Sequence, residues 1–331
     1  EPIRNVSELQ TFLNQAGSGA SANDPCVLPP VIWTDTGGWN ALFETINAAG
    51  KYVALDMSKT PVGEGCVLPA AFSYGCGSTD NARAGKGRVV SFVLPDGINS
   101  IGDFLNFNVI KNVTGVGVEA IGDSAFYGCV DLETINFPSV VTIDNHSFRD
   151  CASLKNANFP LAETIGHHAF RNCASLKNVD FPSAVMIGSE TFRDCAILEA
   201  VNFPLAEIID ALAFYGCTSL ETVNLPNVGI IKEKAFQVSG NATLAVALGQ
   251  TAPSLERDIF YSVNVSKTIT VNIPAVNSGY GTTGTYSGAN STACWANGFR
   301  GGGWGGSGFV DASKINQNIT VILQEASSGA E

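Results

Sequence analysis

The stretch IGDSAFYGCVDLETINFP, residues 121–138, is repeated along this chain with a period of 22 residues. Isoleucine, phenylalanine, cysteine, leucine and proline each keep the same place in successive copies. The repeated cysteines are Cys129, Cys151, Cys173, Cys195 and Cys217, and the repeated phenylalanines are Phe126, Phe148, Phe170, Phe192, Phe214 and Phe236. A unit this short cannot bury a hydrophobic face by itself, so the copies must stack on one another as a solenoid.

Each unit divides into a strand and a return segment. The strand alternates, with Ile135 and Phe137 predicted to point inward and Thr134 and Asn136 outward. Pro138 ends the strand, because proline has no N–H to donate to a ladder. A period in the low twenties is typical of a leucine-rich-repeat coil. We therefore predict an α/β-type, mostly β solenoid, which is a right-handed coil with a parallel concave sheet, a helical N-terminal cap and an irregular β C-terminal cap.

Stacking brings equivalent side chains of successive coils about 4.8 Å apart, which is one strand spacing. The repeated phenylalanines should then form a continuous aromatic spine, in which burial of each ring contributes about 2–3 kcal/mol. The repeated cysteines should be buried free thiols that pack as small hydrophobic side chains, because each occupies one slot of the repeat.

The N-terminal region is predicted to cap the first open edge of the sheet. Helical spacing of apolar residues covers residues 6–16 and again residues 39–46, where Gly50 ends the second helix. An alternating strand follows at residues 51–57. Residues 63–87 are rich in glycine and low in pattern, so we predict a long surface loop there.

Beyond Phe236 the repeat loosens. The predicted elements are a degenerate strand at residues 244–248, a strand at 268–274, an aromatic-held cap at 279–308, a last strand at 318–323 and a frayed tail from Gln324. The predicted domains are residues 1–88 for the N-terminal helices, capping strand and loop, 89–274 for the leucine-rich-repeat solenoid, and 275–331 for the C-terminal cap and tail.

The unit resembles the BspA-like (Treponema-type) leucine-rich repeat, which reads roughly Ile-Gly-x-x-Ala-Phe-x-x-Cys-x-x-Leu-x-x-(Val/Ile)-x-(Leu/Phe)-Pro. The likeness is strong from Ile121 to Pro226 and weaker in one or two coils on either side, and the KYVALD stretch at residues 51–56 adds to it. These units are one residue shorter than the commoner unit of the family, which should alter curvature more than fold. The resemblance implies a secreted or cell-surface protein of host-associated bacteria, used for adhesion or protein binding, and no catalytic residues.

Composition excludes several classes of partner. The formal net charge is −12 and only 15% of the 331 residues are charged, whereas nucleic acid or anionic lipid would require clustered lysine and arginine. No apolar run approaches the roughly 20 residues of a membrane-spanning helix. The sequence opens at Glu1 without an initiating methionine or a signal peptide, so we interpret it as a mature, processed or truncated form of an exported protein.

No enzymatic activity, metal or cofactor is expected. The three histidines, His146, His167 and His168, precede repeat phenylalanines on the outer side of the coil, where solvated surface roles are expected. The sequence has no nucleophile elbow, zinc-binding His-Glu-x-x-His pair or phosphate loop.

Three cysteines outside the repeat leave alternatives open. Cys66 and Cys76 are near enough in sequence to close a disulfide loop, or they remain thiols. Cys294 lies in a glycine-rich segment and is the only cysteine for which a reactive role stays open.

Strand alternation places a row of short polar side chains along the concave sheet. The candidate binding residues are Asn136, Lys155, Asn156, Asn158, Lys177, Asn178, Asp180, Asn202 and Asn224. In one interpretation, the amides form a hydrogen-bonded ladder that keeps the sheet soluble. In the other, an extended groove binds a polypeptide or glycan, although the row has no aromatic residue to serve as an anchor.

With the resemblance added, we predict an exported cell-surface protein that binds a host extracellular-matrix or cell-surface protein or glycan. The alternative is a structural module of the cell envelope that has no specific ligand.

Overall fold

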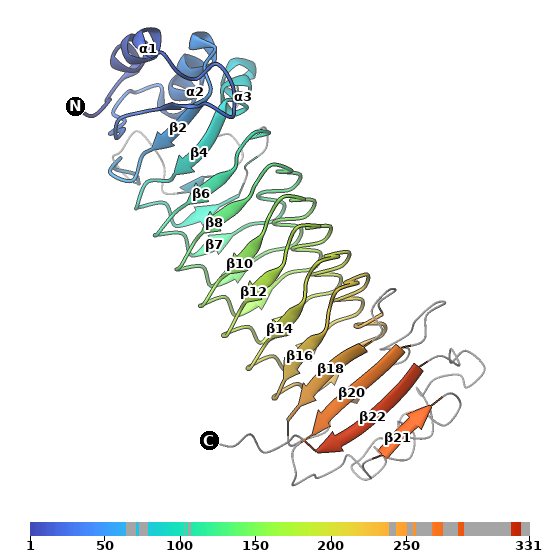
Figure 1. Cartoon of the computed structure of the whole chain (residues 1–331). Helices are drawn as coiled ribbons and strands as arrows, with labels where there is room; N and C mark the ends of the chain where they lie inside the picture. Colours follow the sequence, from blue (N-terminus) through green and yellow to red (C-terminus); the bar gives the residue numbers. More distant parts are fainter. Residues whose placement is uncertain are drawn as a thin grey trace. The chain divides into compact units, whose positions relative to one another are not determined.

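The computed structural model of the chain describes residues 1–63, 71–72, 79–102, 104, 107–237, 243–249, 254–255, 267–273, 284–287 and 319–325. The chain divides into two compact units, Glu1–Pro160 and Leu161–Glu331. Each unit is a run of β-solenoid coils with parallel strands (Figure 1). The predicted fold class is therefore confirmed in both.

Two helices open the first unit, α1 (Val6–Gln15) and α2 (Gly38–Ala49). The side chain of Asn5 caps α1 by accepting a hydrogen bond from a backbone N–H of the first turn. Gly50 ends α2 in the left-handed conformation, with a φ of 67°. These helices and β2 (Val53–Asp56) confirm the predicted N-terminal elements. No helix in the described ranges is long and apolar enough to cross a bilayer.

The prediction of a loop at residues 63–87 is wrong in part, because α3 (Asp80–Lys86) is a helix. It begins at Thr79, whose hydroxyl caps the first turn, and it packs against α2. A Cβ added to Gly85 would lie 1.8 Å from the carbonyl oxygen of Phe43, so only glycine fits this contact. The glycines that weaken the helical pattern in the sequence are thus one of the features that let this helix pack closely.

The remaining coils of the first unit follow the predicted order. Its main sheet has the parallel order β1-β2-β4-β6-β8. A second row of short parallel strands has the order β3-β5-β7-β9. Their bounds are β1 Cys26–Val27, β3 Ala71–Phe72, β4 Val89–Val93, β5 Ser100–Ile101, β6 Asn112–Thr114, β7 Ala120–Ile121, β8 Thr134–Asn136 and β9 Thr142–Ile143, and β10 Asn156–Asn158 closes the unit.

The second unit repeats the arrangement with a longer main sheet, β12-β14-β16-β18-β20-β22-β21, and short strands β11-β13-β15-β17-β19. All pairs are parallel except β21 with β22. The main strands are β12 Asn178–Asp180, β14 Ala200–Asn202, β16 Thr222–Leu225, β18 Thr243–Leu248, β20 Lys267–Ile273, β21 Gly284–Ser287 and β22 Ile319–Glu325. The short strands are β11 Thr164–Ile165, β13 Met186–Ile187, β15 Ile208–Ile209, β17 Ile230–Ile231 and β19 Ser254–Leu255.

The end of the second unit confirms some predictions and corrects one. Strands β18 and β20 occur where strands were predicted. The frayed tail predicted from Gln324 is wrong for two residues, because Gln324 pairs with Asn272 and Glu325 pairs with Ile273 in the parallel ladder. Most of the predicted cap at residues 279–308 lies outside the described residues.

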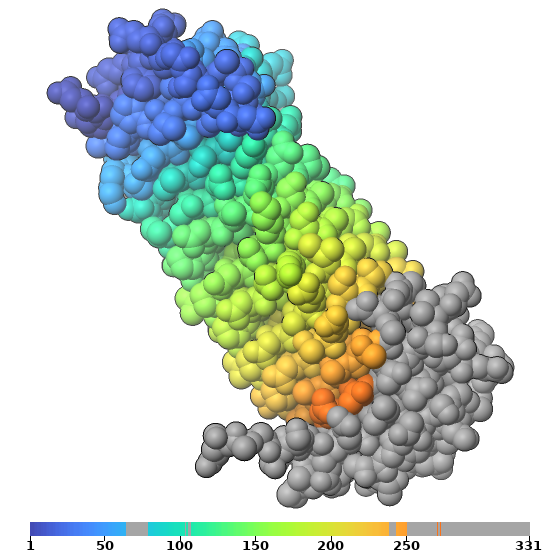
Figure 2. All heavy atoms as spheres, in the orientation of Figure 1, coloured from blue at the N-terminus to red at the C-terminus, as the bar shows by residue number. Residues whose placement is uncertain are grey.

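The aromatic spine is confirmed within each unit. Stacking of neighbouring rings contributes about 0.5–1.5 kcal/mol per pair beyond burial. Within each unit, coils that follow one another in sequence lie side by side, as the bands of colour in Figure 2 show. The centroid separations are 5.0 Å for Phe126–Phe148 in the first unit, and 5.5 Å for Phe170–Phe192, 5.5 Å for Phe192–Phe214 and 5.1 Å for Phe214–Phe236 in the second.

The ladder cysteines are buried free thiols, as predicted. The Sγ atom of Cys195 lies 3.1 Å from the carbonyl oxygen of Phe170, and that of Cys217 lies 3.1 Å from the carbonyl oxygen of Phe192. Each of these thiols therefore donates to the backbone of the preceding coil. Burial raises the pKa of both thiols above the ordinary value, which keeps them protonated and unreactive.

The return segments pass through the left-handed region twice. The first position holds Ser124, His146, His168, Glu190, Leu212 and Lys234 at φ of 55–58°, and the second holds Gly128, Asp150, Asn172, Asp194 and Gly216 at φ of 61–75°. The second position uses only glycine, asparagine and aspartate, which tolerate this conformation best. The first position accepts other residues, so the surrounding coil must hold the backbone there.

Candidate binding site on the strand sheet

The main strands present alternate side chains to solvent, as the sequence predicts. In the first unit, Asn136, Asn156 and Asn158 are exposed on β8 and β10, with Lys155 beside them. In the second unit, the exposed candidate residues are Lys177, Asn178, Asp180, Asn202 and Asn224. Each predicted residue thus lies on the solvent face of a main strand or next to one.

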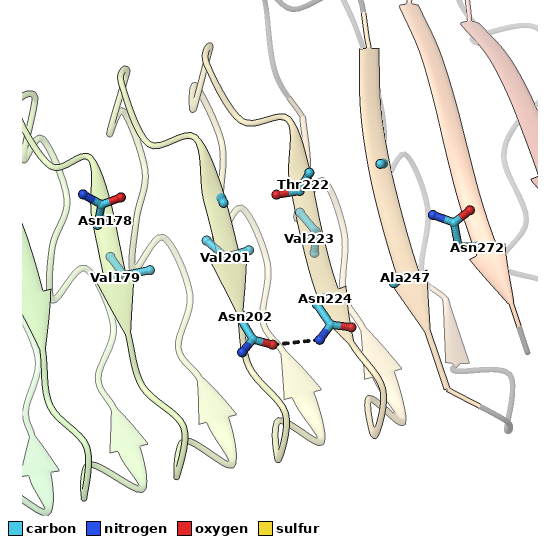
Figure 3. Close-up of a pocket in the computed structure, with 11 residues that line it drawn as sticks. Asn178, Val179, Val201, Asn202, Thr222, Val223, Asn224, Ala247 and Asn272 are labelled. Atoms are coloured by element: carbon cyan, nitrogen blue, oxygen red, sulfur yellow. Dashed lines mark hydrogen bonds between the residues drawn. The ribbon is translucent and has the colours of Figure 1, made fainter. Parts of the chain in front are cut away.

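The second unit carries a groove of about 460 Å³ on this face. Eleven residues of β12, β14, β16, β18 and β20 line it (Figure 3). They are Asn178, Val179, Ala200, Val201, Asn202, Thr222, Val223, Asn224, Ala245, Ala247 and Asn272. None of these lining residues is charged, so the groove can recognise a ligand only through hydrogen bonds and apolar contact.

Small side chains hollow the groove. Ala245 pairs with Thr222 and Ala247 pairs with Asn224, so each alanine stands where the preceding strand carries a larger polar side chain. Ala200 likewise stands beside Asn178 in the ladder. The groove therefore opens where the repeat pattern of polar side chains is interrupted.

Carboxamides surround the hollow. The Nδ2 atom of Asn224 donates to Oδ1 of Asn202 at 2.7 Å (Figure 3). This hydrogen bond uses one donor and one acceptor and leaves each of the two amides with further hydrogen-bonding capacity. Asn178 and Asn272 line the groove from β12 and β20. The side chains can offer both donors and acceptors to a bound chain.

The two candidate lysines make ion pairs at the margin of the sheet. Lys155 pairs with Glu133 at 2.5 Å, and the Lys155 hydrogen bond lowers the pKa of that carboxyl. Lys177 pairs with Glu199 at 3.1 Å. Such exposed pairs contribute little to stability. Neither lysine lines the groove, and Asp180 does not line it either.

Three groove residues are absent from the sequence prediction, namely Ala245, Ala247 and Asn272. Their signal is present, because the alternation in the predicted strands at residues 244–248 and 268–274 places all three outward. Their neighbours are decided by a register that the 22-residue period does not supply, since Thr222 and Ala245 are 23 residues apart.

The outer side of the second unit holds a cluster around Glu190. Its Oε2 atom lies 2.7 Å from Nη1 of Arg171, 3.1 Å from Nη1 of Arg193 and 3.3 Å from Nδ1 of His168. The side chain of His168 is only 24% exposed, so the solvated role expected for it is wrong. His167 is exposed and accepts a hydrogen bond from the Ser189 backbone N–H. These contacts give both histidines a structural role between adjacent coils.

No group of three metal-ligating side chains occurs among the described residues. Cys66, Cys76 and Cys294 lie outside those residues, so the disulfide and the reactive thiol both stay predictions.

Comparison with known proteins identifies the repeat. The family model described as the BspA type leucine-rich repeat region matches residues 80–199 and 185–280, with six copies. No curated protein matches the chain.

Solved structures with similarity to the chain include three bacterial proteins. A leucine-rich repeat protein from Bacteroides ovatus is 23% identical, with a TM-score of 0.47, over 57% of this chain and 50% of that one. A leucine-rich cell surface protein from Faecalibacterium prausnitzii is 21% identical, with a TM-score of 0.31, over 44% of this chain and 56% of that one. The pneumococcal vaccine antigen PcpA is 15% identical, with a TM-score of 0.36, over 78% of this chain and 84% of that one.

The aligned part of this chain covers about half the length of each of the first two. Because the family model covers more than half of the sequence, and the coils have the strand, turn and buried ladder of that repeat, the chain belongs to the BspA-type leucine-rich-repeat family.

Proposed function

We propose that this protein is an exported cell-surface binding protein that holds a host matrix or cell-surface protein or glycan against its main sheet. The observation that carries the proposal is the uncharged, amide-lined groove over β12 to β20. Membership of the BspA-type family motivates the cell-surface location.

The lining favours a neutral, extended ligand. The groove crosses several parallel strands, so equivalent amides recur about every 4.8 Å along it. Asn202 and Asn224 each keep hydrogen-bonding capacity beyond their mutual bond. The valine and alanine side chains beneath them supply apolar contact. A charged ligand would find no countercharge among the lining residues.

One observation favours the alternative, a structural envelope module that has no specific ligand. The hydrogen bond between Asn202 and Asn224 is what an amide ladder needs to remain soluble without a partner. On that view, the groove is a by-product of the alanines at the end of the regular array.

Binding to an immobilised array of matrix proteins and glycans distinguishes the two functions. Wild-type protein is compared with a groove variant, Asn202→Ala with Asn224→Ala, and with a matched control, Asn136→Ala with Asn158→Ala. Each control residue occupies the same place in a coil of the first unit. Loss of two hydrogen-bonding amides should weaken groove binding about tenfold or more, while the control binds as wild type.

Binding that both variants retain would remove the site from this groove. No binding by any form, with all three proteins folded, would favour the structural module.

A further inference from the structure

The second row of strands in the second unit exposes a ladder of apolar side chains. Met186 of β13 pairs with Ile208 of β15, which pairs with Ile230 of β17. Met186 and Ile230 are each 37% exposed, and Ile208 is half-buried. The same slot in the first unit holds Ser100, Ala120 and Thr142. An apolar ladder at this slot is therefore a property of the second unit and not a requirement of the coil.

Further apolar side chains widen this surface. Val185 directly precedes Met186 and is 39% exposed, and Leu205 in the next coil is 49% exposed. We call Val185, Met186, Leu205, Ile208 and Ile230 the outer apolar ladder. Contiguous exposed apolar residues of this kind mark interaction sites more often than scattered ones do.

Two glutamates lie on the outer apolar ladder at equivalent places. Glu163 and Glu207 occupy the slot that Val185 fills in the coil between them, and both are exposed. Neither carboxylate makes an ion pair with a described residue. The surface therefore combines an apolar strip with two carboxylates that are two coils apart.

The spacing of these groups matches an α-helix laid across the coils. Two coils advance about 9.6 Å at one strand spacing each, and seven helical residues advance about 10.5 Å. One coil, at about 4.8 Å, is close to one helical turn of about 5.4 Å. Apolar residues repeating every turn of a helix can thus meet successive members of the ladder, and basic residues at i and i+7 can meet the two glutamates.

We propose that the outer apolar ladder is a docking site for a basic amphipathic helix of a partner protein. The helix buries its apolar stripe on Met186, Ile208 and Ile230, in the helix-on-groove manner of peptide recognition, and its lysines or arginines pair with Glu163 and Glu207. This site uses the opposite row of strands from the amide-lined groove and does not depend on ligand binding there.

The charge of the chain favours this partner over the other occupants of an apolar surface. At a net charge of −12, a second copy of the chain would add like charge and no basic stripe. Anionic lipid attracts basic and not acidic surfaces. A basic helix is the partner that satisfies both the apolar strip and the two carboxylates.

A synthetic peptide of about 21 residues, six helical turns, tests the proposal with the purified full chain. The peptide carries leucine at the two heptad core positions and lysine at one flanking position, and a second peptide has glutamate in place of each lysine. Fluorescence anisotropy measures both affinities at low salt and at about 0.5 M salt, where surface charge is largely screened.

Three protein variants accompany the wild type. Met186→Ser with Ile230→Ser should weaken binding about tenfold or more. Glu163→Gln with Glu207→Gln should weaken it several-fold at low salt, and that difference should vanish at high salt. The matched control changes the same slot in the first unit, Ala120→Ser with Thr142→Ser, and should bind as wild type.

Several results would overturn the proposal. These are no binding of the basic peptide by the wild type, equal affinity for the two peptides at low salt, or equal affinity of the wild type and the Met186→Ser, Ile230→Ser variant. Self-association of the wild type that this variant loses, measured by sedimentation, would assign the surface to a second copy. Ladder-dependent binding to neutral vesicles would assign it to a membrane.

Discussion

Replacement of Phe192 by alanine should open the second unit at one identifiable coil. The ring is fully buried and stacks between Phe170 and Phe214, with centroids 5.5 Å away on each side. Phenylalanine-to-alanine changes in protein cores lower the free energy of unfolding by about 3–5 kcal/mol. We expect the upper part of that range, because two stacked pairs of about 0.5–1.5 kcal/mol each are lost together.

Phe192→Leu separates burial from stacking. Leucine fills much of the space but cannot stack, so its cost should be smaller by about 2 kcal/mol or more than that of alanine. A double-mutant cycle of Phe192→Leu and Phe214→Leu should give a coupling free energy of about 0.5–1.5 kcal/mol. A leucine pair that shows no coupling would refute the stacking argument.

The buried thiols provide the assay. Cys195 lies in the coil of Phe192 and is inaccessible in the folded state. Its rate of alkylation under native conditions therefore reports the free energy of local opening, and peptide mass spectrometry resolves it from Cys151 of the first unit. Phe192→Ala should accelerate labelling of Cys195 far more than that of Cys151. Equal acceleration at both would show that the coils open together and would contradict a nearest-neighbour solenoid.

Two further predictions concern ionisation and backbone strain. Because burial raises the pKa of Cys195 and Cys217, unfolded thiols ionise from about pH 8.5 while folded ones stay protonated, and the free energy of unfolding should fall by about 1.4 kcal/mol per pH unit for each thiol above that pH. Urea unfolding under reducing conditions measures this slope, and an identical slope in Cys195→Ala with Cys217→Ala would contradict it. At the left-handed position of Ser124, with φ of 58°, Ser124→Val should lower the unfolding free energy by about 1–2 kcal/mol and Ser124→Gly should not; equal stabilities of the two variants would argue against strain there.

The regular coils could be predicted in detail from the sequence. Phe192, Cys195 and Asn202 each lie where the period and the alternation place them: spine, thiol ladder and solvent face. Prediction succeeds here because each coil repeats the same local solution, and a nearest-neighbour stack converts a sequence period directly into a spatial ladder.

Prediction fails where contacts depend on elements that do not repeat. Helix α3 was predicted as a loop, because its two glycines weaken the helical pattern, while Gly85 is needed for the close contact with Phe43. The half-buried ion pair of His168 with Glu190 was also missed. The two residues are 22 positions apart, but nothing in the period says that one is basic where the other is acidic.

The sequence by itself thus determined the solenoid, its buried spine and thiol ladder, and the outward direction of the strand amides. Only the tertiary structure decided which outward residues become neighbours beyond the regular array. Ala245 lies beside Thr222 and Thr270 beside Ala245, although 23 and 25 residues separate these pairs. Backbone hydrogen bonds between coils of unequal length set that register, and the groove exists because of it.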